Sequence, residues 1–171
     1  MSQARNGGTT IKAERAVLHG NAAGRDHVTI SITVNGYAHG GIGIPDRSEV
    51  NRGKKIRIVK REGYKANELR GLQVIGDSMN GKVNGKDGPR NGDIVIARVP
   101  KDGRIPKNGS MVVAWFPGLG DPVVKCFFYD KKTNEISLEP ANPNYDVVRL
   151  QAEDVDIQGI VVDVIPSFQS R

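Results

Sequence analysis

Apolar and polar residues alternate along most of this chain in short runs, and the runs are rich in β-branched side chains. The clearest run is 27–34, His-Val-Thr-Ile-Ser-Ile-Thr-Val, in which every second residue is apolar. A period of two places apolar side chains on one face of a strand, so this run predicts a half-buried strand. Shorter apolar runs predict further strands at Ile56–Val59, Leu72–Ile75, Asp93–Val99, Ser110–Phe116, Val123–Tyr129, Glu135–Glu139, Val147–Leu150 and Val155–Ile165.

Typical turn sequences separate these runs, as at Asn91-Gly92, Asp102-Gly103 and Asn108-Gly109. Asn35-Gly36 is a similar signal and is expected to end the first strand. The glycine-rich stretch Tyr37–Pro45 is then expected to form a flexible loop. Apart from a short helix predicted at Ile11–Leu18, no convincing amphipathic helix is present. The pattern predicts a mainly β domain of barrel-like or sandwich form with little helix.

The length of 171 residues suits one domain with a core of its own. The first residues are small, polar and glycine-containing, so 1–27 is expected to be a flexible arm and 28–168 the folded domain. Cys126 is the only cysteine, which excludes a disulfide within the chain. The apolar runs are far shorter than the roughly 20 residues that span a bilayer. We therefore expect a soluble, cytoplasmic protein with no membrane partner.

The formal net charge is +6, and basic residues are concentrated between positions 52 and 70. A basic segment of this kind can contact nucleic acid or another acidic partner. The alternative is a solvated strand-and-turn face, because no recognisable DNA-binding motif accompanies the charges. Aromatic residues make up 5% of the chain, which argues against a stacking platform for single strands. The residues concerned are Arg52, Lys54, Lys55, Arg57, Lys60, Arg61, Lys65 and Arg70.

The strongest candidate chemistry lies at Gly76-Asp77-Ser78-Met79, directly after an apolar run. A serine at a strand end keeps nearby backbone N–H groups free, as an acyl-transfer nucleophile requires. Lys125 is the one cation in the apolar run 122–128, and burial can lower the pKa of a lysine by several units. A neutral lysine can accept a proton from serine, so Ser78 and Lys125 are predicted to form a nucleophile–base pair without histidine.

Each of these signals also has a structural interpretation. Gly-Asp-Ser is an ordinary turn sequence, and a lone lysine such as Lys125 can protect an edge strand from pairing. Ser110 follows an Asn-Gly turn and is interpreted as the start of a strand. Cys126 is expected on the strand face opposite Lys125, as a small buried residue. The three histidines are scattered without suitable acid spacing, so we predict no metal site and no cofactor.

Taken in order, these segments resemble the self-cleaving Ser-Lys peptidase domain shared by LexA, UmuD and phage repressors of the lambda CI type. The resemblance covers roughly residues 33–165 and implies an all-β fold built around a compact, strongly bent sheet. It also implies that Ser78 is the nucleophile and Lys125 the general base, with the backbone N–H groups of Asp77 and Ser78 as the oxyanion hole. The matching segments are 76–79, 91–97, 108–114, 124–125, the Leu-x-Pro-x-Asn-x-x-Tyr element at 138–145, and 158–162.

Members of this family cut their own chain between a small residue and a glycine upstream of the serine. His39-Gly40 occupies the position that the family uses, although His39 is larger than the usual alanine. Ala23-Gly24 has the usual residue types but precedes the first predicted strand. We favour His39-Gly40 as the segment that occupies the cleft. Whether this bond is cut stays open at this point, because of the size of His39.

The resemblance implies a self-processing serine peptidase that regulates a DNA-damage (SOS) or prophage response. It implies a homodimer, a RecA-type filament as activator, and DNA or a DNA polymerase as further partners. Residues 1–27 are too short and glycine-rich for a helix-turn-helix, so both a UmuD-like protein and a repressor fragment fit. The alternative function is a non-cleaving oligomerisation or binding module of the same fold, with segment 52–70 contacting nucleic acid. A signal-peptidase relative is disfavoured because the sequence has no membrane anchor.

Overall fold

The computed structural model describes residues 29–40, 53–59 and 61–167 of the chain. The predicted arm at 1–27 lies outside these ranges, as do the helix expected at Ile11–Leu18 and the alternative cleavage site at Ala23-Gly24. In the described ranges no helix is long and apolar enough to cross a membrane. The described helices are the short 3-10 helices η2 (Ala66–Glu68) and η3 (Ala152–Asp154). The strands are β1 (Thr29–His39), β2 (Lys55–Val59), β3 (Leu69–Ile75), β4 (Lys82–Val83), β5 (Lys86–Asp87), β6 (Ile94–Arg98), β7 (Ser110–Trp115), β8 (Val123–Asp130), β9 (Glu135–Glu139), β10 (Val148–Gln151) and β11 (Asp156–Ile165).

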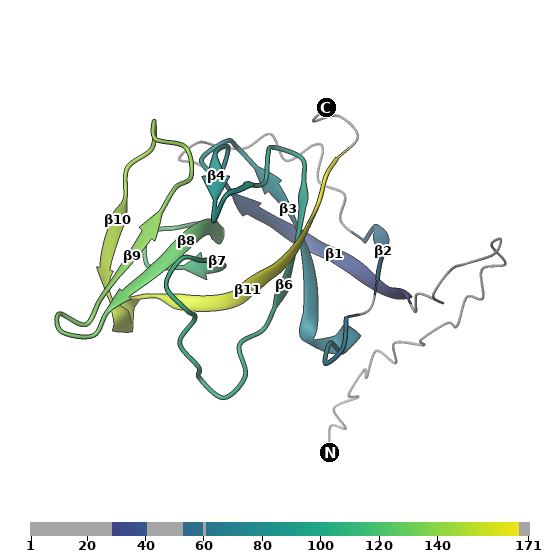
Figure 1. The fold of residues 1–171 in the computed structure, drawn as a ribbon, viewed down its shortest axis with the longest axis horizontal. Coiled ribbons are helices and arrows are strands. Elements are labelled where there is room, and N and C mark those ends of the chain that lie inside the picture. The colour runs from purple at the N-terminus through teal and green to yellow at the C-terminus, as the bar shows by residue number, and fades with distance from the viewer. Residues whose placement is uncertain (1–28, 41–52, 60, 168–171) are drawn as a thin grey trace, which may run out of the picture.

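Nine of these strands form one sheet in the order β10-β9-β8-β7-β11-β6-β3-β1-β2 (Figure 1). At its far end β1 also pairs with β8, through His39 and Val123. This pairing joins two strands that are distant in the sheet order, so the strands from β8 round to β1 close into a ring. Closure requires strong bending of the sheet. The prediction of a mainly β fold around a strongly bent sheet is therefore confirmed.

The long strand β11 holds the two sides of the ring together. Its first half pairs with β7 and its second half with β6, and the register shifts once in each pairing. In Figure 1 this yellow strand sweeps from the β7–β10 side of the molecule to the side that holds β1, β3 and β6. Irregularities of this kind bend a strand and increase its twist, which lets one strand serve both sides.

Three apolar clusters fill the fold. The first gathers around Val74, Met79 and Val124, close to the predicted nucleophile. The second lies among β1, β2, β3 and β6, and the third among β7, β8 and β9. Met79 and Phe127 are among the largest fully buried side chains, and each contributes about 2 kcal/mol through burial of apolar surface. The residue next to Ser78 is therefore anchored in the core.

The turn predicted at Asn35-Gly36 is wrong. β1 runs straight through this position to His39, with a register shift between Val34 and Gly36. Up to Thr33 the strand pairs with β2, and from Val34 onward it runs parallel to β3. Pairing with two other strands thus outweighs the local preference of Asn-Gly for a hairpin turn. Residues 37–39, predicted as part of a loop, are strand, and residues 41–45 lie outside the described ranges.

Candidate active site

Ser78 lies in a tight turn directly after β3. Gly76 has a φ of +97°, a backbone conformation that side chains disfavour. Its N–H donates to the side-chain oxygen of Asn91 at 2.8 Å, and the N–H of Asn80 donates to the carbonyl of Asp77 at 2.9 Å. These bonds reverse the chain after the strand and fix the turn, so the sequence signal at 76–79 marks the strand end as predicted.

Lys125 enters the site from the middle of the sheet. Its strand, β8, lies between β7 and β9, and Lys125 is in register with Val112. An interior strand needs no protection from edge pairing, so the edge-strand interpretation of this lysine does not hold. Lys125 Nζ donates to Ser78 Oγ at 2.5 Å. The serine has no exposed surface and the lysine is 6% exposed, which makes this a desolvated pair.

Burial lowers the pKa of Lys125 to about 8 from its ordinary value of 10.5. The cause is desolvation, because the charged ammonium loses its water in an apolar surrounding. Among the described residues no carboxylate forms an ion pair with this ammonium, and an ion pair would have favoured the charge. The neighbouring Cys126 thiol acts weakly in the opposite direction. A large fraction of Lys125 is therefore neutral in mildly alkaline solution and can accept a proton.

The loop after β9 holds the nucleophile turn from the other side. The Asn142 N–H donates to the Ser78 carbonyl at 2.9 Å, and its side-chain amide donates to the Asp77 carbonyl at 3.1 Å. The Asn142 oxygen in turn accepts from the N–H of Asn144 at 3.1 Å. Asn142 is buried and has its hydrogen bonds satisfied, as a buried amide requires. Asn142 therefore positions both residues predicted to form the oxyanion hole, Asp77 through its side chain and Ser78 through its backbone.

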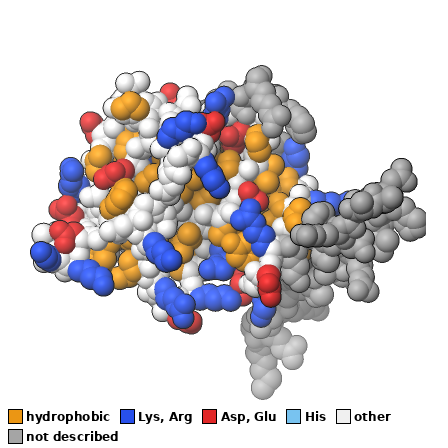
Figure 2. Space-filling view, in the orientation of Figure 1, with side chains coloured by type: hydrophobic (Ala, Val, Ile, Leu, Met, Phe, Trp, Pro, Cys, Tyr) orange, Lys and Arg blue, Asp and Glu red, His pale blue; other side chains and the backbone are white. Residues whose placement is uncertain are grey.

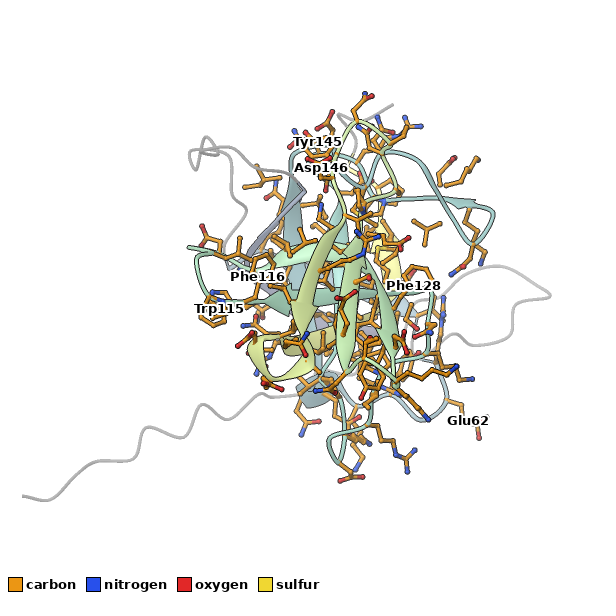
Figure 3. All side chains as sticks on the ribbon, turned by 90° about the vertical axis from the view of Figure 1, so that its left-hand side faces the viewer. Glu62, Trp115, Phe116, Phe128, Tyr145 and Asp146 are labelled. Atoms are coloured by element: carbon orange, nitrogen blue, oxygen red, sulfur yellow. The ribbon has the colours of Figure 1, made fainter. Side chains whose placement is uncertain are left out.

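Tyr145, from the same loop, covers the lysine. Its hydroxyl donates to a carboxylate oxygen of Asp77, and this bond raises the pKa of Tyr145. The centre of its ring lies 5.7 Å from Lys125 Nζ. In Figure 3 Tyr145 lies at the upper end of the sheet, at the opposite end of the view from Glu62. The sequence identified the 138–145 element but assigned no role to Asn142 or Tyr145, because their contacts with Asp77 span more than 60 positions.

The end of β1 reaches the same site. The Gly40 N–H donates to the Ile75 carbonyl, and the Gly40 carbonyl accepts from the Ser78 N–H. One of the two N–H groups predicted for the oxyanion hole is thus engaged with the chain's own backbone. The segment predicted to occupy the cleft, His39-Gly40, lies beside the nucleophile because β1 continues past Asn35-Gly36.

Two other residues considered from the sequence, Ser110 and Cys126, lie in surroundings that suit a structural role. Ser110 begins β7, opposite Phe127, and its N–H donates to the Lys107 carbonyl at 3.0 Å. Cys126 is half-buried and packs against the first apolar cluster, where burial raises the pKa of its thiol. A raised pKa keeps the thiol protonated and weakly nucleophilic.

A family model described as peptidase S24-like matches residues 33–162, most of the described fold. The chain belongs to the peptidase S24-like family. It is 32% identical over 140 residues to a LexA repressor of Syntrophobacter fumaroxidans, across 77% of this chain and 62% of that protein. It is 30% identical over 126 residues to a LexA repressor of Carboxydothermus hydrogenoformans, across 74% of this chain and 56% of that protein. The chain therefore spans about three fifths of the length of the curated relatives it matches.

Proposed function

We propose that this S24-like protein is a serine endopeptidase that cuts its own chain, with Ser78 as nucleophile and Lys125 as general base. The observation that carries the proposal is the 2.5 Å contact between Lys125 Nζ and Ser78 Oγ in a desolvated site. A serine hydroxyl is a weak nucleophile until a base takes its proton, and a lysine serves only when it is neutral. Burial supplies that condition by lowering the pKa of Lys125 to about 8.

The chemistry follows from this arrangement. Neutral Lys125 accepts the Ser78 proton as the Ser78 oxygen attacks a peptide carbonyl carbon. Backbone N–H groups at Asp77 and Ser78 bind the oxygen that becomes negative, and one such donor contributes about 3 kcal/mol to catalysis. The Lys125 ammonium then gives its proton to the departing amine. Water hydrolyses the ester on Ser78, with Lys125 again acting as base.

The substrate proposed is the chain itself, because the end of β1 already contacts the nucleophile turn. A segment held in place by a sheet competes with outside peptides at a very high effective concentration. The pairings of β1 with both β3 and β8 supply that restraint. Self-cleavage is then a first-order process whose rate does not depend on protein concentration.

The biological role is proposed from the relatives, both of which are named as LexA repressors. We propose that self-cleavage regulates a DNA-damage (SOS) or prophage response. A RecA-type filament would act as activator, the protein would work as a homodimer, and DNA or a DNA polymerase would be a further partner. In this role cleavage inactivates or converts the protein once, so a slow intrinsic rate with external stimulation is expected.

The test is mild alkaline incubation of the wild type and of Ser78→Ala, followed by intact-mass measurement. Fragments are expected from the wild type and none from Ser78→Ala, and the half-time should be the same in a dilution series. Ser110→Ala is the matched control, because Ser110 is a half-buried serine outside the site, and it should fragment like the wild type. Equal fragmentation of Ser78→Ala and wild type would refute the proposal.

A further inference from the structure

The direction of the backbone at the end of β1 decides which carbonyl the nucleophile meets. In acyl transfer, the oxyanion-hole donor binds the carbonyl oxygen of the residue that is attacked. Here the Ser78 N–H donates to the carbonyl of Gly40. From this contact we infer that the bond cut is the one on the carboxyl side of Gly40, between Gly40 and Gly41, and not His39–Gly40. The inference rests on the proposed function and names its site.

Strand geometry excludes the carbonyl of His39 from the same position. In a strand the N–H and C=O of one residue point to the same side, and successive residues point to opposite sides. Both backbone groups of Gly40 point to the β3 side, where they meet Ile75 and Ser78. The backbone groups of His39 therefore point to the other side, where His39 pairs with Val123 of β8. Attack on His39 would require β1 to shift by one residue.

The space around Gly40 also favours Gly40 as the attacked residue. A Cβ added to Gly40 would lie 3.0 Å from the carbonyl carbon and oxygen of Gly76 and 3.2 Å from the Ile75 oxygen. These neighbours are backbone atoms of the nucleophile turn, which cannot rotate away as a side chain would. The residue presented to Ser78 must therefore be very small, and glycine meets that requirement.

This register also accounts for the large residue at position 39. The family pattern of a small residue followed by glycine is met by Gly40-Gly41. His39 then precedes the attacked residue, so the requirement for a very small residue applies to Gly40 and not to position 39. The bond expected from the sequence, His39–Gly40, is one position away from the bond that the backbone contacts favour.

The covalent step is balanced with the groups already named and water. The Ser78 oxygen bonds to the Gly40 carbonyl carbon while its proton passes to neutral Lys125. The C–N bond to Gly41 breaks, and the nitrogen takes that proton and leaves as a new N-terminal amine. Water then splits the ester between Ser78 and Gly40, which leaves a carboxylate at Gly40 and restores the serine hydroxyl. Gly41 enters as the next residue in the sequence and lies outside the described ranges.

Sequencing the N-terminus of the larger fragment tests the inference directly in the full wild-type chain. We expect Gly-Ile-Gly-Ile, which begins at Gly41, and a small fragment that ends at Gly40. A sequence of Gly-Gly-Ile-Gly, heavier by one glycine residue, would place the cut at His39–Gly40. That result would overturn this inference and leave self-cleavage intact. Absence of any Ser78-dependent fragment would overturn both.

Two substitutions distinguish cleavage after Gly40 from cleavage after His39 by their effect on the rate. His39→Ala should cleave at the same bond within about threefold of the wild-type rate, because residue 39 is not the attacked residue. Gly40→Ala should slow cleavage by about tenfold to 100-fold, since displacement of the reacting carbonyl by a fraction of an ångström is costly. Strong acceleration by His39→Ala would contradict the inference. Thermal unfolding of Gly40→Ala in the Ser78→Ala background checks that the loss of rate does not come from unfolding.

Discussion

Two regions of this molecule carry basic side chains in opposite surroundings. Lys125 is held in an interior strand, contacts Ser78, and lies under the ring of Tyr145. The outer edge of the sheet, at β2 and the turn after it, carries several lysines and arginines that are exposed to solvent. Arg61 in this region approaches Asp163 at 3.7 Å, with the arginine side chain 58% exposed and the aspartate side chain 35% exposed. An exposed pair of this kind contributes little to stability.

The two regions differ in burial, which governs how readily a lysine releases its proton. The desolvated Lys125 has a pKa of about 8 and can lose its proton to serve as a base. The exposed cations keep their water, and charges of this kind influence a partner mainly through their summed field. Figure 2 shows Lys and Arg side chains spread over the visible face with carboxylates among them. The edge of β2 therefore suits weak, salt-sensitive contacts, and the interior site suits the proposed proton transfer from Ser78.

Removing the buried charge has the largest expected effect. Lys125→Met keeps the length of the side chain and removes the base, so cleavage should fall by about 10³-fold or more. Intact-mass time courses of the two proteins measure this. Lys82→Met is the matched control, because Lys82 is an exposed lysine that pairs with Asp87 at 2.6 Å. If Lys125→Met cleaved within tenfold of the wild-type rate, the buried Lys125 would not be the base, and it would not differ in this respect from an exposed lysine.

The same substitution should stabilise the fold. In the folded state the pKa of Lys125 is about 8, whereas the unfolded chain has the ordinary 10.5. The folded state therefore holds its proton less tightly, which costs up to about 3 kcal/mol below pH 8. As pH rises from 8 to 10.5 this cost disappears, so stability gains relative to a chain without the lysine.

Urea unfolding in the Ser78→Ala background checks this without interference from cleavage. Lys125→Met should be more stable than its parent at pH 7, by up to about 3 kcal/mol, and the gap should close towards pH 10.5. Tyr145 and Cys126 also titrate near Lys125, but both are present in the two proteins, and the weak coupling between Cys126 and Lys125 is a minor part of the difference. A gap that is absent at pH 7, or that widens with pH, would show that Lys125 is not desolvated.

Loss of the Asn142 side chain should have an intermediate effect. Asn142→Ala removes the donor to the Asp77 carbonyl, a bond that contributes about 1 kcal/mol, so cleavage should slow about fivefold. The shape of the pH–rate curve should stay the same, because Asn142 positions the turn and does not touch the Lys125 amine. Asn144→Ala is the control, since Asn144 uses only its backbone N–H in this contact. If Asn142→Ala and Asn144→Ala cleaved at equal rates, the Asn142 side chain would have no positioning role.

Changes at the β2 edge should have the smallest effect on cleavage. Replacing Lys54, Lys55 and Arg57 with glutamine should leave the cleavage rate within about twofold, because these exposed side chains lie outside the site. If this edge contacts DNA, the same variant should weaken binding and flatten its dependence on salt. Gel-shift titrations at two salt concentrations measure that. A large loss of cleavage in this variant would instead show that the β2 edge influences the active site.

Short-range patterns revealed much of this fold. Alternating β-branched residues marked the strands, because the period of a strand is visible in a few residues. The pairing of Ser78 with Lys125 was predicted from the order of motifs, and the structure brings their side chains together across 47 positions. Their roles in cleavage stay predictions until they are tested.

Contacts between distant segments were harder to predict. Asn35-Gly36 has the composition of a turn, but the partners of β1 on both sides keep it extended. The hydrogen bonds that Asn142 and Tyr145 donate to Asp77 depend on two loops that are distant in the sequence and adjacent in the fold. The register at Gly40 depends on which carbonyl points towards Ser78, and a one-residue shift in a strand reverses that direction. No local signal in the sequence carries this information.

The pH dependence of self-cleavage tests the role of the buried lysine most directly. First-order rates of the wild type, measured by intact mass from pH 6 to pH 10.5, should follow the neutral fraction of Lys125. With a pKa of about 8, the rate should rise about tenfold between pH 7 and pH 9 and then level off. A rate that is independent of pH, or that still rises steeply above pH 10 as for an ordinary solvated lysine, would contradict a desolvated Lys125 as the base.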